Sequence, residues 1–122
     1  MVLHQLQKII AKDIHRFRVL RCGRRWGKTV LMVEEFKGKA IGKPRRCVYI
    51  ANNYQQARDI AWEMFKNEFA GRIIDTNEQR LELKVESQNG KESLILLRGW
   101  ESIENLRGQA FDFIGIDEVA SM

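Results

Sequence analysis

The stretch that decides the fold is Cys22-Gly-Arg-Arg-Trp-Gly-Lys-Thr29. An apolar and basic run at residues 17–21 precedes it and predicts a β-strand, and residues 28–40 predict a helix. A strand, a glycine-containing loop that ends in Gly-Lys-Thr, and a helix are the arrangement of a phosphate-binding loop. Successive backbone N–H groups and the positive end of the helix dipole both favour phosphate at such a point.

Two residues of this loop have clear chemical roles. Lys28 would reach the β- and γ-phosphates of a nucleotide, and the Thr29 hydroxyl would ligate Mg²⁺. The strict pattern G-x-x-x-x-G-K-[ST] requires glycine where this chain has Cys22, and Gly23 comes one place late. Gly23 can still provide the backbone freedom that close approach to phosphate needs. The alternative is a glycine-bearing turn ahead of a basic helix.

The composition is that of a soluble globular domain. The chain has 122 residues, of which 44% are hydrophobic and 30% charged, enough for one small domain with a core. It has no apolar run of membrane-spanning length and no apolar signal segment at its start. Its two cysteines, Cys22 and Cys47, are expected to be small buried residues in a reducing compartment. Without a Cys/His ligand spacing, we expect no structural zinc.

The net charge of +5 suits a polyanionic partner, either a nucleotide or a nucleic acid. The basic residues gather in two clusters. The first comprises Arg16, Arg18, Arg21, Arg24, Arg25 and Lys28, and the second comprises Lys37, Lys39, Lys43, Arg45 and Arg46. A solvated basic face is an equally good interpretation of the second cluster.

Upstream of the loop, residues 2–14 carry apolar side chains at helical spacing. Gln5 and Gln7 lie early in this predicted helix. A glutamine ahead of a phosphate-binding loop can donate to and accept from adenine with a single carboxamide. A solvated helix glutamine is the alternative.

Downstream of the loop, a strand and a second helix follow. Residues 46–51 predict a strand that is apolar enough to be internal to a parallel sheet. Asn52 or Asn53 is expected to cap the next helix, which residues 54–70 predict as an amphipathic helix packed on the sheet. We expect Ile60 on its packing side and Trp62 in the flank of the core, not as a platform for base stacking.

A β-hairpin then interrupts the alternation of strands and helices. Residues 81–86 alternate apolar and charged side chains, Asn89-Gly90 predicts a turn, and residues 94–97 predict the returning strand. Residues 99–108 predict a loop or short helix that carries Arg107. With no repeat or linker in the sequence, we expect one domain.

The last strand supplies the second half of the candidate site. It is apolar and ends in Asp117-Glu118. Asp117 would hold the Mg²⁺ shell beside Thr29, and Glu118 would act as general base on the attacking water. Ligands bind at the carboxyl ends of strands in such sheets, which is where both carboxylates fall. Each acid alone has a simpler explanation as a surface charge, but together with the Gly-Lys-Thr loop they predict a triphosphatase site.

A triphosphatase also needs an arginine to offset charge at the γ-phosphate in the transition state. Arg24 lies four residues before Lys28 and is positioned to act on its own site. Arg107 is a candidate to act on the site of a neighbouring subunit, and Arg25 is a third candidate. Their alternative role is that of structural cations or surface charges.

These residues together resemble the large terminase subunits of tailed bacteriophages over nearly the whole chain. The stretch from Gly23 to Thr29 resembles the family's arginine-bearing Walker A loop, in which the first consensus glycine is often absent. Residues 3–7 resemble its adenine-recognising stretch, where Gln7 matches better than Gln5 by distance to the loop. Residues 106–108 and 113–118 resemble its approach to Walker B. The nucleotide-binding residues that the resemblance implies are Gln7 or Gln5, Gly23, Arg25, Trp26, Gly27, Lys28 and Thr29.

The resemblance implies a motor that couples ATP hydrolysis to the movement of double-stranded DNA into a capsid. The implied cofactors are ATP and Mg²⁺. The implied partners are double-stranded DNA, the portal protein, a small terminase subunit and further copies of the chain in a ring. A membrane is not among the implied partners. The implied location is the cytoplasm of an infected bacterium, or of a host that carries the gene in a prophage.

The fold that the resemblance implies is an α/β P-loop NTPase of the additional-strand class. We therefore expect a mostly parallel sheet flanked by helices, with an inserted β-hairpin. In this class a later strand lies between the loop strand and the Walker B strand. That strand, the coupling motif and the family's nuclease domain are not in this sequence. The resemblance thus implies that residues 1–122 are the N-terminal part of an ATPase domain, and it predicts a gap in the sheet.

Two other functions fit parts of the pattern. Superfamily helicases also combine a glutamine motif with Gly-Lys-Thr and Asp-Glu, although the sequence here continues Asp117-Glu-Val-Ala120. The Asn89-Gly90 hairpin and Arg24 favour terminase. A nucleotide- or DNA-binding module without turnover is the third possibility.

Overall fold

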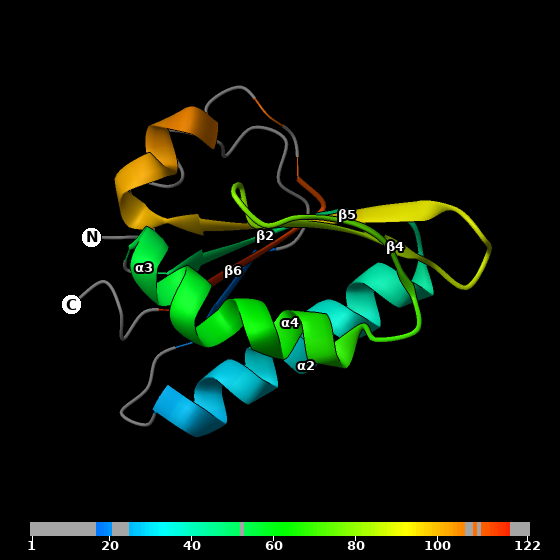
Figure 1. The fold of residues 1–122 in the computed structure, drawn as a ribbon, viewed down its shortest axis with the longest axis horizontal. Helices are drawn as coiled ribbons and strands as arrows, with labels where there is room; N and C mark the ends of the chain where they lie inside the picture. Colours follow the sequence, from blue (N-terminus) through cyan, green and yellow to red (C-terminus); the bar gives the residue numbers. More distant parts are fainter. Residues whose placement is uncertain (1–16, 21–24, 52, 107–108, 110, 118–122) are drawn as a thin grey trace.

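The computed structural model describes residues 17–20, 25–51, 53–106, 109 and 111–117, and gives the backbone alone at 17–20, 25–31 and 117. Within these ranges, six strands form one sheet in the order β1-β6-β2-β5-β4-β3. Helices cover both faces of the sheet (Figure 1). No helix in the described part of the chain is long and apolar enough to cross a membrane.

The elements alternate along the chain in the manner of an α/β protein. The strands are β1 (Phe17–Leu20), β2 (Arg46–Ala51), β3 (Ile73–Asn77), β4 (Glu82–Glu86), β5 (Glu92–Gly99) and β6 (Phe113–Asp117). The helices are α2 (Arg25–Gly42), α3 (Tyr54–Gln56), the π-helix η2 (Ala57–Ala61), α4 (Trp62–Glu68) and the 3-10 helix η3 (Trp100–Leu106). The predicted strand at residues 46–51 and the predicted hairpin are confirmed.

The sheet is mixed. β1, β6, β2 and β5 run parallel to one another, and β4 and β3 continue from β5 in antiparallel pairs. The returning strand of the hairpin, β5, therefore belongs to both parts. The sequence analysis did not predict β3, an exposed edge strand whose register with β4 shifts between Ile73 and Asp75.

The expected gap beside the last strand is wrong for the described sheet. β1 pairs directly with β6, with Phe17 opposite Ile114 and Leu20 opposite Asp117. No described strand lies between them, so the backbone groups of these two strands bond to each other. This pairing brings the strand before the Gly-Lys-Thr motif against the strand that ends in Asp117.

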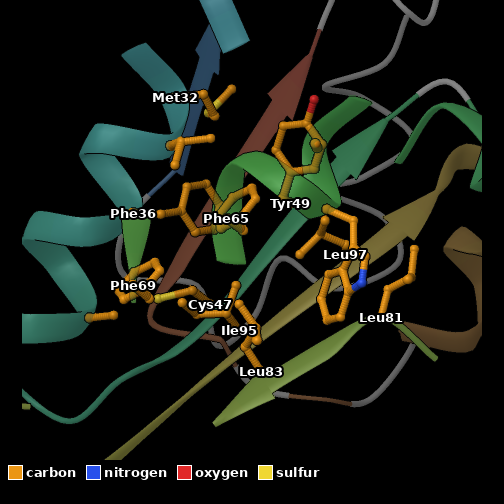
Figure 2. Close-up of a cluster of buried hydrophobic side chains, with 14 of the residues drawn as sticks. Met32, Phe36, Cys47, Tyr49, Phe65, Phe69, Leu81, Leu83, Ile95 and Leu97 are labelled. Atoms are coloured by element: carbon orange, nitrogen blue, oxygen red, sulfur yellow. The ribbon is translucent and has the colours of Figure 1, made fainter. Parts of the chain in front are cut away.

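One face of the sheet packs against α2 and the 54–68 helical segment, as Figure 1 shows. Phe36 of α2 lies edge-to-face against Phe65 of α4 and Phe113 of β6, with ring centroids 5.2 and 4.8 Å apart. Tyr49 of β2 joins them, and Figure 2 shows Phe36, Phe65 and Tyr49 meeting between the helices and the sheet. Aromatic pairs in this geometry each add about 0.5–1.5 kcal/mol beyond their buried area. This cluster holds α2 in place relative to β6.

The helical segment after β2 contains a π turn that the sequence analysis did not predict. In η2 the Trp62 N–H donates to the carbonyl of Ala57, five residues back. The extra residue lets Ala57 and Trp62, five residues apart, both be buried, while Arg58 is exposed. The predicted place of Ile60 on the packing side is wrong, because the turn leaves that side chain 40% exposed. Trp62 is buried in the core, as predicted.

The opposite face of the sheet packs against η3, drawn in orange in Figure 1. Ile103 and Leu106 of η3 join a buried cluster with side chains of β2, β5 and β6, among them Ile114 and Ile116. η3 therefore rests directly on the strand that ends in Asp117.

The carboxyl end of α2 is tied to the hairpin. The last carbonyls of a helix have no partner within it and need donors from elsewhere. The buried Ser93 hydroxyl donates to the Ala40 carbonyl at 2.7 Å, and the Gln88 N–H donates to the Ile41 carbonyl at 2.8 Å. The Arg45 guanidinium donates to the Lys39 carbonyl at 2.9 Å. These bonds secure the far end of the helix that carries Lys28.

Gly115 allows α2 to lie close to β6. A Cβ at this position would come within 2.5 Å of both the Met32 sulfur and Phe36 Cε1. We expect Gly115→Ala to lower the free energy of unfolding by about 1–3 kcal/mol, because the packed core has no room for the methyl group. Urea unfolding followed by circular dichroism would measure it.

Gly38 provides the matched control. It lies in the carboxyl-terminal half of α2, and a Cβ there would meet nothing within 4 Å. Gly38→Ala should raise the free energy of unfolding by about 0.5–1 kcal/mol, since alanine costs less entropy in a helix. Equal effects of the two substitutions would contradict the close packing at Gly115.

Candidate nucleotide-binding site

The carboxyl ends of the four parallel strands meet at one edge of the sheet. Leu20, the last residue of β1, lies opposite Asp117, the last residue of β6. Ile50 of β2 lies opposite Ile116, and Ala51 lies opposite Gly99 at the end of β5. In parallel α/β sheets this edge is where ligands bind. The candidate site is therefore built at the ends of β1 and β6.

The Gly-Lys-Thr motif begins a helix at this edge. β1 ends at Leu20 and α2 begins at Arg25, so residues 21–24 connect them. The sequence analysis predicted that the helix begins at Lys28, and the structure starts it three residues earlier. Arginine is a good helix former and a single glycine costs only about 1 kcal/mol, so the run through Gly27 can be helical. The backbone of Lys28 and Thr29 consequently lies in the first turns of α2.

A second helix begins at the same edge, but its first N–H groups are already occupied. The Asn53 side chain accepts from the Gln56 N–H at 2.8 Å, as the predicted cap. The Glu101 carboxylate accepts from the Tyr54 N–H at 3.0 and 3.1 Å. Gly99 makes room for this contact, because a Cβ there would collide with Glu101 and the backbone of Asn53. A carboxylate and an amide thus fill the anion-binding position of this helix.

Glu101 is a residue that the sequence analysis missed. Its partner lies 47 residues away in the sequence, and an exposed glutamate carries no local signal of such a contact.

Several predicted site residues lie outside the described residues. They are Gln5, Gln7, Gly23, Arg24, Arg107 and Glu118, together with Cys22 and the predicted helix at residues 2–14. Arg25, Trp26, Gly27, Lys28, Thr29 and Asp117 are described by their backbone alone. What the structure brings together is the end of β1, the start of α2 and the end of β6.

The second basic cluster serves the structure at the opposite edge. Arg46, at the start of β2, places its guanidinium over the Phe111 ring, 5.3 Å from the centroid, and donates to Gln109. Its backbone N–H donates to the Asp112 carboxylate at 3.0 Å. Lys37 pairs with Glu68 at 3.2 Å. These contacts favour the interpretation of this cluster as a structural and solvated basic face.

The pKa values of a buried thiol and of an exposed carboxyl depart from their ordinary values. Burial, with the nearby Asp112 charge as a smaller cause, raises the pKa of the Cys47 thiol to about 12. The thiol is therefore neutral at pH 7, which fits the predicted role of a small buried residue. The Trp62 indole N–H donates to Glu78 at 2.7 Å and, with Lys66, lowers the pKa of that carboxyl.

The chain is therefore an α/β protein. The helix that contains Gly-Lys-Thr begins at the same edge of the sheet at which the strand ending in Asp117 stops. A family model described as terminase large subunit, T4likevirus-type, N-terminal, matches residues 19–122. The chain belongs to this family, and membership indicates a role in phage DNA packaging. No curated protein and no solved structure matches the chain.

Proposed function

We propose that the chain is an ATP-hydrolysing motor domain that couples hydrolysis to the movement of double-stranded DNA into a capsid. The observation that carries the proposal is the pairing of Leu20 with Asp117. It joins the strand before Gly-Lys-Thr to the strand before Glu118, two motifs that are about ninety residues apart in the sequence. Membership of the terminase large subunit family supports the same function.

The residue types at this edge suit a nucleotide with its metal. The Thr29 hydroxyl and the Asp117 carboxylate are oxygen donors, which Mg²⁺ prefers, and both belong to elements that begin or end there. Mg²⁺ would neutralise charge on the phosphate oxygens. Lys28 would hold the β- and γ-phosphates, and Glu118 would take the proton of the attacking water.

The remaining predicted residues keep their proposed roles. Arg24 would stabilise the charge of the transition state within its own subunit, and Arg107 would act on a neighbouring site. Gln7, or Gln5 in its place, would read the adenine edge. Arg25 and Trp26 would complete the loop.

The proposed assembly follows the family. Copies of the chain's parent protein would form a ring that works with a portal protein and a small terminase subunit in the cytoplasm of an infected bacterium. We propose that residues 1–122 are the first part of the P-loop ATPase domain of that protein. Terminase family membership argues against the helicase alternative.

The experiment that tests this function measures binding and hydrolysis separately. We expect the full-length parent protein to bind Mg²⁺-ATP by calorimetry and to release inorganic phosphate from it. ATP binding without phosphate release would favour the alternative of a nucleotide-binding module without turnover. Absence of ATP binding would refute the proposed function.

A further inference from the structure

The Glu101 carboxylate connects the two helical layers of the domain at the carboxyl edge of the sheet. Glu101 belongs to η3, which covers one face, and both of its oxygens accept from the backbone N–H of Tyr54, at 3.0 and 3.1 Å. Tyr54 begins the helical segment that covers the other face (Figure 1). The contact therefore crosses the edge of the sheet at which the proposed ATP site lies.

The end of β5 is shaped for this contact. Gly99, the last residue of β5, is buried, and a Cβ there would collide with Glu101 Oε1 and with the Tyr54 nitrogen. It would also collide with the carbonyl carbon of Asn53. Glycine is the residue that lets two backbone segments approach so closely. The start of η3 and the end of β2 thus meet at a point where any side chain on residue 99 would separate them.

Capping of the helix does not by itself explain Glu101. Asn53 already caps this helix, since its side chain accepts from the Gln56 N–H at 2.8 Å. Asn53 is the neighbour of Tyr54 in the sequence, whereas Glu101 is 47 residues away. The Tyr54 hydroxyl donates to the Gln79 carbonyl at 2.9 Å, so the ring of this residue is held as well. Glu101 therefore adds a bond between layers to a helix that has a local cap.

η3 connects this contact to the strand that ends in Asp117. Ile103 and Leu106 of η3 pack in the buried cluster that contains Ile116 of β6. Ile116 directly precedes Asp117 and lies opposite Ile50 of β2. One end of η3 is thus bound to the helix that follows β2, while its buried side rests on β6, the neighbour of β2 in the sheet. The contact made by η3 at the edge therefore limits its movement along β6.

We infer that Glu101 is a positioning residue for the proposed ATP hydrolysis. It acts through η3 on the end of β6, where Asp117 lies, and not on the nucleotide itself. The inference rests on the proposed function, because that function places the metal-binding and proton-accepting groups at the end of β6. A displacement of about 1 Å can cost 10²-fold in rate, so a contact that fixes this strand end matters more for turnover than for binding.

The test measures steady-state ATP hydrolysis by the full-length parent protein, with ATP binding followed by calorimetry. We expect Glu101→Ala to lower kcat roughly 10-fold and to leave KM and the stoichiometry of ATP binding unchanged. The stoichiometry counts folded sites, so unfolding would reduce it, whereas a shift of the strand end would not. Glu101→Gln should keep kcat within about threefold of the unaltered protein, since the amide oxygen still accepts from the Tyr54 N–H.

Glu92→Ala is the matched control. Glu92 is exposed at the opposite end of β5, where the strand begins. Its loss makes the same change of charge and size away from the carboxyl edge, so kcat and KM should stay unchanged. An equal loss of kcat in Glu92→Ala and Glu101→Ala would overturn the inference.

A second pair of variants acts on the same contact and keeps the carboxylate. Gly99→Ala should separate Glu101 from Tyr54 and lower kcat to a similar extent as Glu101→Ala. Gly42→Ala is its control, because a Cβ at this end of α2 would meet nothing within 4 Å. A folded Gly99→Ala protein with the kcat of the unaltered protein would contradict the role of the contact. If circular dichroism shows that Gly99→Ala does not fold, the Glu101 variants decide the question.

The outcomes separate this inference from the proposed function. Normal kcat in Glu101→Ala, with hydrolysis by the unaltered protein, would refute the positioning role and leave the proposed function standing. A higher KM with unchanged kcat would mean that Glu101 supports ATP binding, and it would equally overturn the inference. Absence of hydrolysis by the unaltered parent protein would refute the proposed function and the role of Glu101 together.

Discussion

Replacement of Glu118 by glutamine is expected to lower ATP turnover by about 10²- to 10⁴-fold and to leave ATP binding unchanged. The amide keeps the shape of the side chain but cannot accept a proton from water. Glu118 directly follows Asp117, whose strand pairs with the strand before the Gly-Lys-Thr motif. Phosphate release measures turnover, and calorimetry measures binding.

Glu63→Gln is the matched control for this substitution. Glu63 is exposed on α4, and its carboxylate pairs with the Lys66 ammonium at 3.1 Å. α4 lies on one face of the sheet, and η3 lies on the other. Its loss should change stability by less than about 1 kcal/mol and leave turnover intact. Normal turnover in Glu118→Gln would show that another group is the base. Loss of ATP binding in that variant would show that Glu118 supports the nucleotide instead.

Local pattern predicted β2 and the β-hairpin well. β2 has the bounds that the apolar run at residues 46–51 predicts, and all but its first residue are buried. The hairpin was predicted by the alternation in β4 and by Asn89-Gly90, where Gly90 has a positive φ of 86°. In each case the signal lies in adjacent residues and agrees with the tertiary environment.

The features that local pattern missed depend on partners distant in the sequence. β3 has no apolar alternation and exists because β4 offers it a ladder of hydrogen bonds. The π turn in η2 arises because Ala57 and Trp62 must both reach the core, a requirement set by the sheet beneath them. The direct pairing of β1 and β6 reflects which strands are present, so the expected gap did not form.

The motifs in the sequence predicted the residues of the candidate site. They did not predict the contacts that surround it. The position of Asp117 beside the end of β1 follows the expectation for acids at carboxyl strand ends. The contact of Glu101 with the Tyr54 N–H joins segments that are 47 residues apart in the sequence. Single exposed polar residues look alike in a sequence, so only the fold distinguishes those that converge.

Replacement of Lys28 by alanine is expected to weaken ATP binding by roughly 10- to 100-fold. A charge-assisted hydrogen bond to phosphate is worth about 1.5–3 kcal/mol, and each 1.4 kcal/mol is tenfold in affinity. The backbone of Lys28 lies near the start of α2, at the edge where β1 and β6 end. Calorimetric titration with Mg²⁺-ATP measures the change.

Lys37→Ala tests whether this effect belongs to the site or to the charge of the helix. Lys37 lies on the same helix, and its ammonium pairs with Glu68 at 3.2 Å on the surface. Because it lies nine residues further along α2, about 13 Å away, it should leave ATP affinity unchanged. Equal losses in both variants would mean that ATP responds to general positive charge. A loss in Lys28→Ala alone would tie the phosphate to the amino end of α2.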